Sequence, residues 1–106
     1  MHKLDHIVLG CNTIQEGTDY VEKKLGLTLS EIGYHLHMGT HNRVIKISEN
    51  IYLEVIAIDP NANKPKHFRW FNLDNKKQQA RLKKSPQIIG YVIEYQNPHM
   101  LKFYNP

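Results

Sequence analysis

A well-delimited helix between strand-forming segments is the feature that most constrains how this chain folds. Thr13 and Glu16 have the spacing of a capping box, in which a hydroxyl and a carboxylate three residues apart each accept an amide hydrogen that the helix start leaves unpaired. Gly26 ends the helix, because the residue just past a helix often adopts a left-handed conformation. One helical face is marked by Ile14, Gly17, Val21 and Leu25. The sequence therefore predicts a helix over residues 14–25.

Apolar segments with strand character lie on both sides of this helix. Leu4–Leu9 is a compact apolar run that ends at Gly10, as expected of a buried strand. Three more strands are predicted at residues 27–32, 42–48 and 51–58, with the stretch 33–43 as the continuation and turn of the first and a turn at Glu49-Asn50 between the last two. A strand, a helix and three strands in this order favour one sheet that the helix covers on one face.

The second part of the chain repeats the beginning of this pattern. Asp74 or Asn75 can cap a short helix that runs to Lys84, and a strand is predicted over Gln87–Tyr95. Ile88–Ile93 can be laid on Leu4–Leu9 without gaps, with Gly90 at the position of His6. We therefore expect a single domain made of a module over residues 1–60 and, over residues 61–106, a loop, a helix and a strand that begin a second, incomplete module. Residues 96–106 show no helical pattern.

Composition narrows the classes of function. The formal net charge of +4 is mildly basic, and the cluster of five Lys and Arg residues over 76–84 is best explained as a solvated helical face rather than a nucleic-acid site. Cys11 is the only cysteine, so no intrachain disulfide forms, and we expect a small buried side chain rather than a nucleophile. No charged leader and no long apolar run are present, which predicts a cytoplasmic protein without a membrane span.

Two polar residues lie inside segments whose neighbours demand burial. Glu54 is in the centre of the apolar strand 51–58, and His6 is in the first strand. A lone buried carboxylate is costly, so Glu54 must be protonated, paired or bound to a cation. Each residue alone is explained by a hydrogen bond or by exposure to water. Together they offer an imidazole nitrogen and a carboxylate oxygen, a set that suits zinc, manganese, iron or nickel.

A histidine-rich stretch over residues 33–43 is a second candidate site. His35 and His37 are two residues apart and would project to the same side of a strand, so they could chelate one ion. Solvated histidines are also common in loops, and we favour ligand recognition or turn shaping over metal binding for these two and His41. We expect His35 to face a pocket.

The sequence resembles a glyoxalase-like domain of the vicinal oxygen chelate superfamily. The resemblance rests on LDHIVLG, the capped helix ending in KKLGL, and then HMGTHNRVIKI, YLEVIAI and RWFNLD in that order. It implies an α+β fold of the βαβββ type, a curved mixed sheet with one covering helix, followed here by a short helix and one further strand. It also implies metal binding by His6 and Glu54, with Glu54 as the catalytic residue. Substrate contacts are expected from His35, Gly39, Thr40, Asn42 and Arg43.

The resemblance leaves three functions open. The first is metal-dependent lyase, isomerase or dioxygenase-type chemistry on a small molecule. The second is a metal-free module that sequesters a small molecule, for which pocket aromatics such as Tyr52 or Trp70 are needed. The third is an inactive, truncated relative. A full site in the family draws ligands from two modules, so two chains related by a twofold axis would supply two His and two Glu. We therefore expect a homodimer, because the apolar concave face of the sheet needs a partner.

Overall fold

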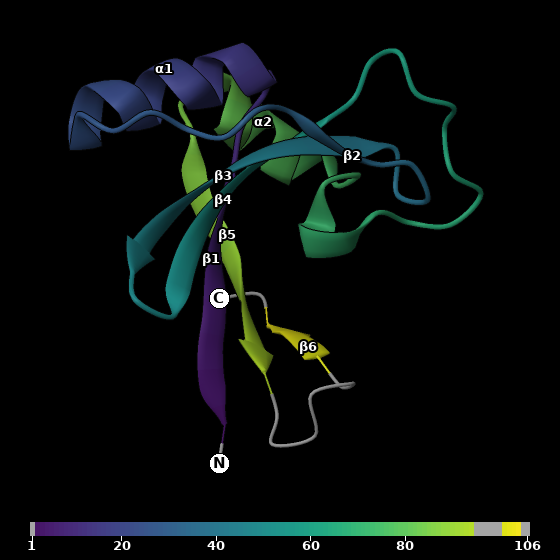
Figure 1. The fold of residues 1–106 in the computed structure, drawn as a ribbon. Helices are drawn as coiled ribbons and strands as arrows, with labels where there is room; N and C mark the ends of the chain where they lie inside the picture. Colours follow the sequence, from purple (N-terminus) through teal and green to yellow (C-terminus); the bar gives the residue numbers. More distant parts are fainter. Residues whose placement is uncertain (1, 95–100, 105–106) are drawn as a thin grey trace.

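The computed structural model describes residues 2–94 in full and the backbone of residues 101–104. It contains one six-stranded sheet in the order β2-β3-β4-β1-β5-β6 (Figure 1). The strands are β1 (Lys3–Gly10), β2 (Gly33–His35), β3 (Thr40–Ser48), β4 (Ile51–Ile58), β5 (Gln87–Glu94) and β6 (Leu101–Tyr104). The helices are α1 (Ile14–Leu25), the 3-10 turn η1 (Trp70–Asn72) and α2 (Lys76–Lys84). The fold is α+β, with a mixed sheet.

The predicted βαβββ unit is confirmed. β1 and β4 pair in parallel, and the other neighbouring strands are antiparallel. Helix α1 starts as expected, because the Thr13 hydroxyl accepts a 3.1 Å hydrogen bond from the backbone N–H of Glu16. It ends at Gly26, whose φ of 66° lies in the left-handed region. The second helix is also confirmed, with Asn75 as its N-cap.

One predicted strand differs from the structure, and the structure contains one strand more than predicted. The segment 27–32 is not a strand, but its predicted continuation contains one, β2 (Gly33–His35). The Ser30 hydroxyl accepts a hydrogen bond from the backbone N–H of Val44. In a continuous strand pair, a backbone carbonyl of the neighbouring strand would accept from this N–H. The structure also adds β6, a four-residue strand that pairs with the end of β5. The predicted strand over Gln87–Tyr95 is confirmed to Glu94. Tyr95 and most of the segment 96–106 lie outside the described residues.

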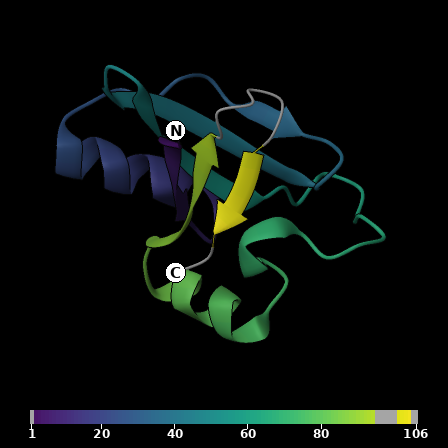
Figure 2. The same cartoon turned by 90° about the horizontal axis from the view of Figure 1, so that it is seen from below.

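The sheet is packed on both faces. On one face, α1 closes a core in which Val21 packs against side chains of β1 and β4, among them Leu9 and Val55. On the other face, η1 and α2 cover a second core, where Phe71 and Leu82 join the buried residues of the central strands. Figure 2 shows η1 and α2 together on one side of the sheet, with β6 beside β5. The chain therefore covers part of the face that the sequence predicts to be open.

The two repeated segments are neighbours in the sheet. β1 and β5 pair antiparallel, with His6 opposite Val92 and Val8 opposite Gly90. In the alignment of the two segments, His6 corresponds to Gly90 and Val8 to Val92. The pairing is therefore symmetric, as for two copies related by a local twofold axis. The division into one complete and one incomplete module remains a prediction.

Arg69 fixes the wide loop that follows β4 (Figure 1). Its guanidinium lies 2.6 Å from Asp74 Oδ1, its Nε donates to the Met38 carbonyl at 3.0 Å, and its backbone N–H donates to Asp74 Oδ2 at 2.7 Å. Burial alone would raise the pKa of Asp74, but these hydrogen bonds from Arg69 outweigh it and lower the pKa. In the described part of the chain, no helix is long and apolar enough to cross a membrane.

Asp74→Asn is expected to lower the free energy of unfolding by about 2 kcal/mol at neutral pH, because hydrogen bonds to charged groups contribute this much. A lowered folded pKa means that the contribution is complete above the pKa of an unfolded aspartate. It disappears as the pH falls through the folded value. Urea unfolding of both proteins at several pH values measures the difference. Asp19→Asn, at an exposed carboxylate on α1, is the control and should cost less than about 0.5 kcal/mol. An equal loss in both variants, or a pH-independent difference, would contradict this account of the loop.

Candidate functional site

The carboxylate of Glu54 is the centre of a buried polar cluster. Glu54 is only 5% exposed. His6 Nε2 lies 3.2 Å from Glu54 Oε1, and His35 Nε2 lies 3.1 Å from Oε2. Asn42 Nδ2 donates to Oε2 at 2.7 Å. Asp5 Oδ2 lies 2.6 Å from His6 Nδ1, on the far side of the imidazole ring. We call these five residues the Glu54 cluster.

Four neighbouring strands bring the cluster together. His6 is on β1, His35 on β2, Asn42 on β3 and Glu54 on β4. Asn42 pairs with Ile56 across the sheet, so Asn42, Ile56 and Glu54 point to the same face, since side chains two residues apart share a face. This is the face on which η1 and α2 pack, because Ile56 belongs to that core.

Electrostatics hold Glu54 as a carboxylate. Burial alone would raise its pKa, but hydrogen bonds with His35, His6 and Asn42 outweigh burial and lower the pKa to about 2. Burial also lowers the pKa of His6, yet the hydrogen bonds and charges of Glu54 and Asp5 raise it above its ordinary value. The cluster is therefore a buried anion flanked by imidazoles.

The three close contacts among His35, Asn42 and Glu54 cannot all be hydrogen bonds at the same time. Asn42 Nδ2 lies within hydrogen-bond distance of both Glu54 Oε2 and His35 Nε2, the latter at 3.0 Å. If His35 Nε2 accepts a hydrogen bond from the Asn42 amide, it carries no hydrogen and cannot donate one to Glu54. If it carries a proton, His35 Nε2 and Asn42 Nδ2 both donate to Glu54 Oε2, and their 3.0 Å separation is a close approach of two donors. The Nε2–H tautomer of His35 therefore pairs both donors with the carboxylate of Glu54.

Aromatic rings border the cluster. Tyr52 stacks on His6 with ring centroids 4.4 Å apart. Trp70 meets His35 edge-on at 5.0 Å. Its neighbour Phe71 has a φ of 54° and is 3% exposed, so the chain turns sharply there. Tyr52 and Trp70 are the two aromatic residues that the sequence predicts for a binding pocket. Sequence reasoning did not include Asp5, although it directly precedes His6.

Several predicted contact residues lie away from the cluster. Arg43 reaches the α1 face, where it donates to the Ser30 carbonyl at 2.7 Å and to the Thr18 hydroxyl at 3.2 Å. Thr40 is buried, and Gly39 forms a turn with a φ of 62°, close to Arg69 and Pro65. Of the predicted contacts, the structure places His35 and Asn42 beside Glu54.

The three histidines of the stretch 33–43 go to different places. His35 joins the Glu54 cluster. His37 is exposed and packs against His67, with ring centroids 4.7 Å apart. His41 Nδ1 lies 4.0 Å from Asp59 Oδ1. His35 and His37 therefore do not form a chelating pair.

The donor types at Glu54 fit a cation, but their number is small. Among the residues that the structure describes, no group of three or more His, Cys, Asp or Glu side chains is placed to hold a metal ion. His6 and Glu54 supply one imidazole and one carboxylate. Asp5 behind the imidazole is the arrangement that fixes the tautomer of a metal-binding histidine. A cation held by these two side chains would keep further positions for water, substrate or another chain.

Cys11 is buried and unsuited to nucleophilic chemistry. It is 2% exposed and its thiol donates to the Ile56 carbonyl at 3.3 Å. Burial raises its pKa to about 12. The prediction of a small buried side chain is confirmed.

A thiol reagent is therefore expected to react with native Cys11 far more slowly than with a free thiol at pH 8. With a pKa of about 12, about one molecule in ten thousand carries the thiolate at that pH. The absorbance change with a chromogenic disulfide measures the rate. Denatured protein is the control, and one thiol per chain should react there at once. Fast labelling of the native protein would show that the thiol is accessible.

One comparison with known protein families agrees with this fold. The family model described as a glyoxalase-like domain matches residues 4–102. No curated protein matches the chain. Among solved structures, a variant of Streptomyces coelicolor methylmalonyl-CoA epimerase in complex with 2-nitronate-propionyl-CoA is similar, with 14% identity and a TM-score of 0.47. The alignment covers 57% of this chain and 46% of the epimerase chain, so this chain spans about half the length of that protein.

Proposed function

We propose that this chain, which belongs to the glyoxalase-like domain family of the vicinal oxygen chelate superfamily, binds a divalent cation at His6 and Glu54 and presents it to a small molecule. The observation that carries the proposal is the 3.2 Å approach of His6 Nε2 to Glu54 Oε1, with Asp5 on the opposite ring nitrogen. A bound cation would supply Lewis acidity toward vicinal oxygens of the small molecule.

Each residue of the Glu54 cluster has a role in this proposal. Asp5 would accept the Nδ1–H hydrogen bond of His6, so that with a cation bound the Nε2 lone pair would bind the cation in place of its present hydrogen bond with Glu54. Asn42 holds Glu54 in place through a 2.7 Å hydrogen bond. His35, whose side chain is 35% exposed, is the member best placed to contact a small molecule that enters from solvent. Tyr52 and Trp70 limit the space on either side through their ring contacts.

We further propose a homodimer in which a second chain completes the site. One chain offers two donors at the position we propose for the cation, and a closed site needs about four. A second copy related by a twofold axis would add another His6 and Glu54. The expected stoichiometry is then one ion for two chains.

Native mass spectrometry after zinc loading tests both parts of the proposal. Wild-type protein purified without chelator should carry zinc, and His6→Ala should lose it. His37→Ala is the matched control because His37 is exposed and pairs with His67 outside the cluster, where adventitious zinc could bind. A zinc-loaded monomer would contradict the dimer alone. Zinc that is lost in His37→Ala and kept in His6→Ala would contradict the proposed site.

A metal-free binding module is the second candidate. It is favoured by the pKa of Glu54, which the surrounding hydrogen bonds lower to about 2, so the carboxylate stays ionised without a cation. Protein that never retains zinc, manganese, iron or nickel, and yet is stabilised against heat by a small molecule, would support this candidate.

A further inference from the structure

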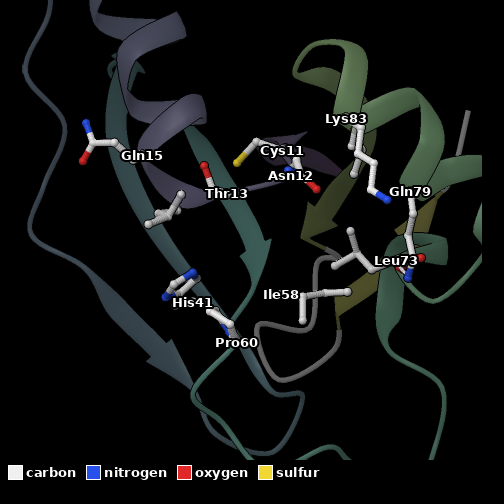
Figure 3. A pocket seen from close by; sticks show the side chains of 12 residues that line it. Cys11, Asn12, Thr13, Gln15, His41, Ile58, Pro60, Leu73, Gln79 and Lys83 are labelled. Carbon is white, nitrogen blue, oxygen red and sulfur yellow. Dashed lines mark hydrogen bonds between the residues drawn. The ribbon is translucent and has the colours of Figure 1, made fainter.

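A separate cavity lies at the other end of the central strands (Figure 3). It has a volume of about 430 Å³ and is lined by the residues that directly follow β1, by the end of β4 and by one side of α2. β1 and β4 are parallel, so their carboxyl ends meet there. No member of the Glu54 cluster lines this cavity. It is therefore a second site rather than an extension of the first.

The surface of the cavity is mostly apolar, although polar side chains also line it, and part of this surface belongs to the core. Cys11, Leu73 and Leu82 line it although each is at most 3% exposed, and Ile14 and Ile58 add further apolar surface. The cavity is open to solvent on one side, so a small molecule can enter it from the surface. Its volume is within the range of small-molecule sites, which are mostly apolar with a few polar groups.

The charged group at the rim is a cation. Lys83, on the last turn of α2, is exposed and lies across the cavity from the segment that precedes α1 (Figure 3). Within the part of the chain that the structure describes, no Asp or Glu lines the cavity and none forms a salt bridge with Lys83. Gln79, one turn earlier, already has a partner within the protein, because its side-chain amide donates a hydrogen bond to the Leu73 carbonyl at 3.0 Å.

We propose that this cavity binds a small carboxylic acid with an apolar chain. The chain occupies the space between Ile58, Leu73 and Leu82, where it removes apolar surface from water. The carboxylate stays at the rim beside the Lys83 ammonium, where both charges remain hydrated. A lysine stem along an apolar surface with its ammonium at the edge suits this arrangement. The inference is independent of the function proposed for the Glu54 cluster.

Octanoate is the probe, and octanol is the neutral control of the same chain length. Titration followed by ¹H–¹⁵N NMR should give saturable shifts at residues 11–15, 58–60 and 79–83. Octanol should bind on the order of fivefold more weakly, because the interaction of one exposed charge pair is small. Lys83→Met should weaken octanoate binding by a similar factor. Lys84→Met is the matched control, since Lys84 is exposed on the same helical turn and does not line the cavity.

Two further variants locate the bound molecule. Ile58→Phe should fill the cavity and abolish the shifts, and Ile47→Phe, at an exposed position of β3 that does not line the cavity, should leave octanoate binding unchanged. If Ile58→Phe does not fold, the comparison of Lys83→Met with Lys84→Met still decides the question. Equal binding of octanoate and octanol would overturn the proposal. So would an equal loss in the two lysine variants, the absence of saturable shifts, or shifts confined to the strands around Glu54.

Discussion

Glu54→Gln is expected to weaken the binding of a divalent cation by at least about 100-fold, since even changes to residues behind metal ligands cost 10–100-fold. Glutamine keeps the size of the side chain and one oxygen but removes the negative charge. The carboxylate is 5% exposed and its two oxygens meet nitrogens of His6, His35 and Asn42. Removal of the charge leaves those groups without an anion at the centre. Calorimetric titration with zinc or manganese measures the loss.

Glu31→Gln is the matched control for this prediction, because Glu31 is an exposed glutamate outside the cluster. It should bind the cation as the wild type does. Circular dichroism establishes that each variant is folded. If Glu54→Gln is unfolded, His6→Gln serves as the second variant, since it removes the imidazole from the other side of the contact. Wild-type affinity in folded Glu54→Gln would place the cation elsewhere on the chain.

Ile56→Ala is expected to lower the free energy of unfolding by about 3–4 kcal/mol, as large-to-small changes at buried isoleucines do. Ile56 is completely buried and belongs to the core that η1 and α2 close over the sheet. A domain of this size has a total stability of about 5–15 kcal/mol, so the loss is a large part of it. Urea unfolding monitored by circular dichroism gives the value.

Ile47→Ala is the control for the core, because Ile47 lies in the neighbouring strand β3 but is 42% exposed. It should cost less than about 1 kcal/mol. Similar losses in the two variants would mean that the core on the α2 face contributes little to stability. A small loss in Ile56→Ala, together with an unchanged fold, would contradict the packing described here.

Local sequence signals predict much of the fold. The capping residue Thr13 and the terminating Gly26 delimit α1 because both satisfy backbone groups at a helix end. The residues 51–58 predict β4 with its observed bounds, since a continuous apolar run is what a strand buried on both faces requires. The segment 27–32 is wrong as a strand, because the Ser30 side chain takes the place of a backbone partner of Val44. β6 is only four residues long and carries no comparable local signal.

The candidate site is predictable in part. His6 and Glu54 are detected as polar residues in apolar segments, and the structure places them 3.2 Å apart. The position of His35 depends on the pairing of β2 with β3, which no local spacing specifies. Arg43 is next to Asn42 on a strand, so alternation alone sends it to the opposite face. The resemblance to the family predicts ligand contacts for both residues. In the structure, Asn42 contacts Glu54, whereas Arg43 contacts Ser30 on the other face of the sheet.

The side-chain nitrogen resonances of the histidines show whether His6 and Glu54 bind the cation. A long-range ¹H–¹⁵N spectrum of the imidazole rings, recorded before and after addition of zinc, distinguishes His6 from the six other histidines of the chain. We expect the His6 Nε2 resonance to move on zinc addition and not to move in Glu54→Gln, and we expect the His37 and His67 resonances to stay in place. Movement of the His37 and His67 resonances with His6 unchanged would contradict this expectation.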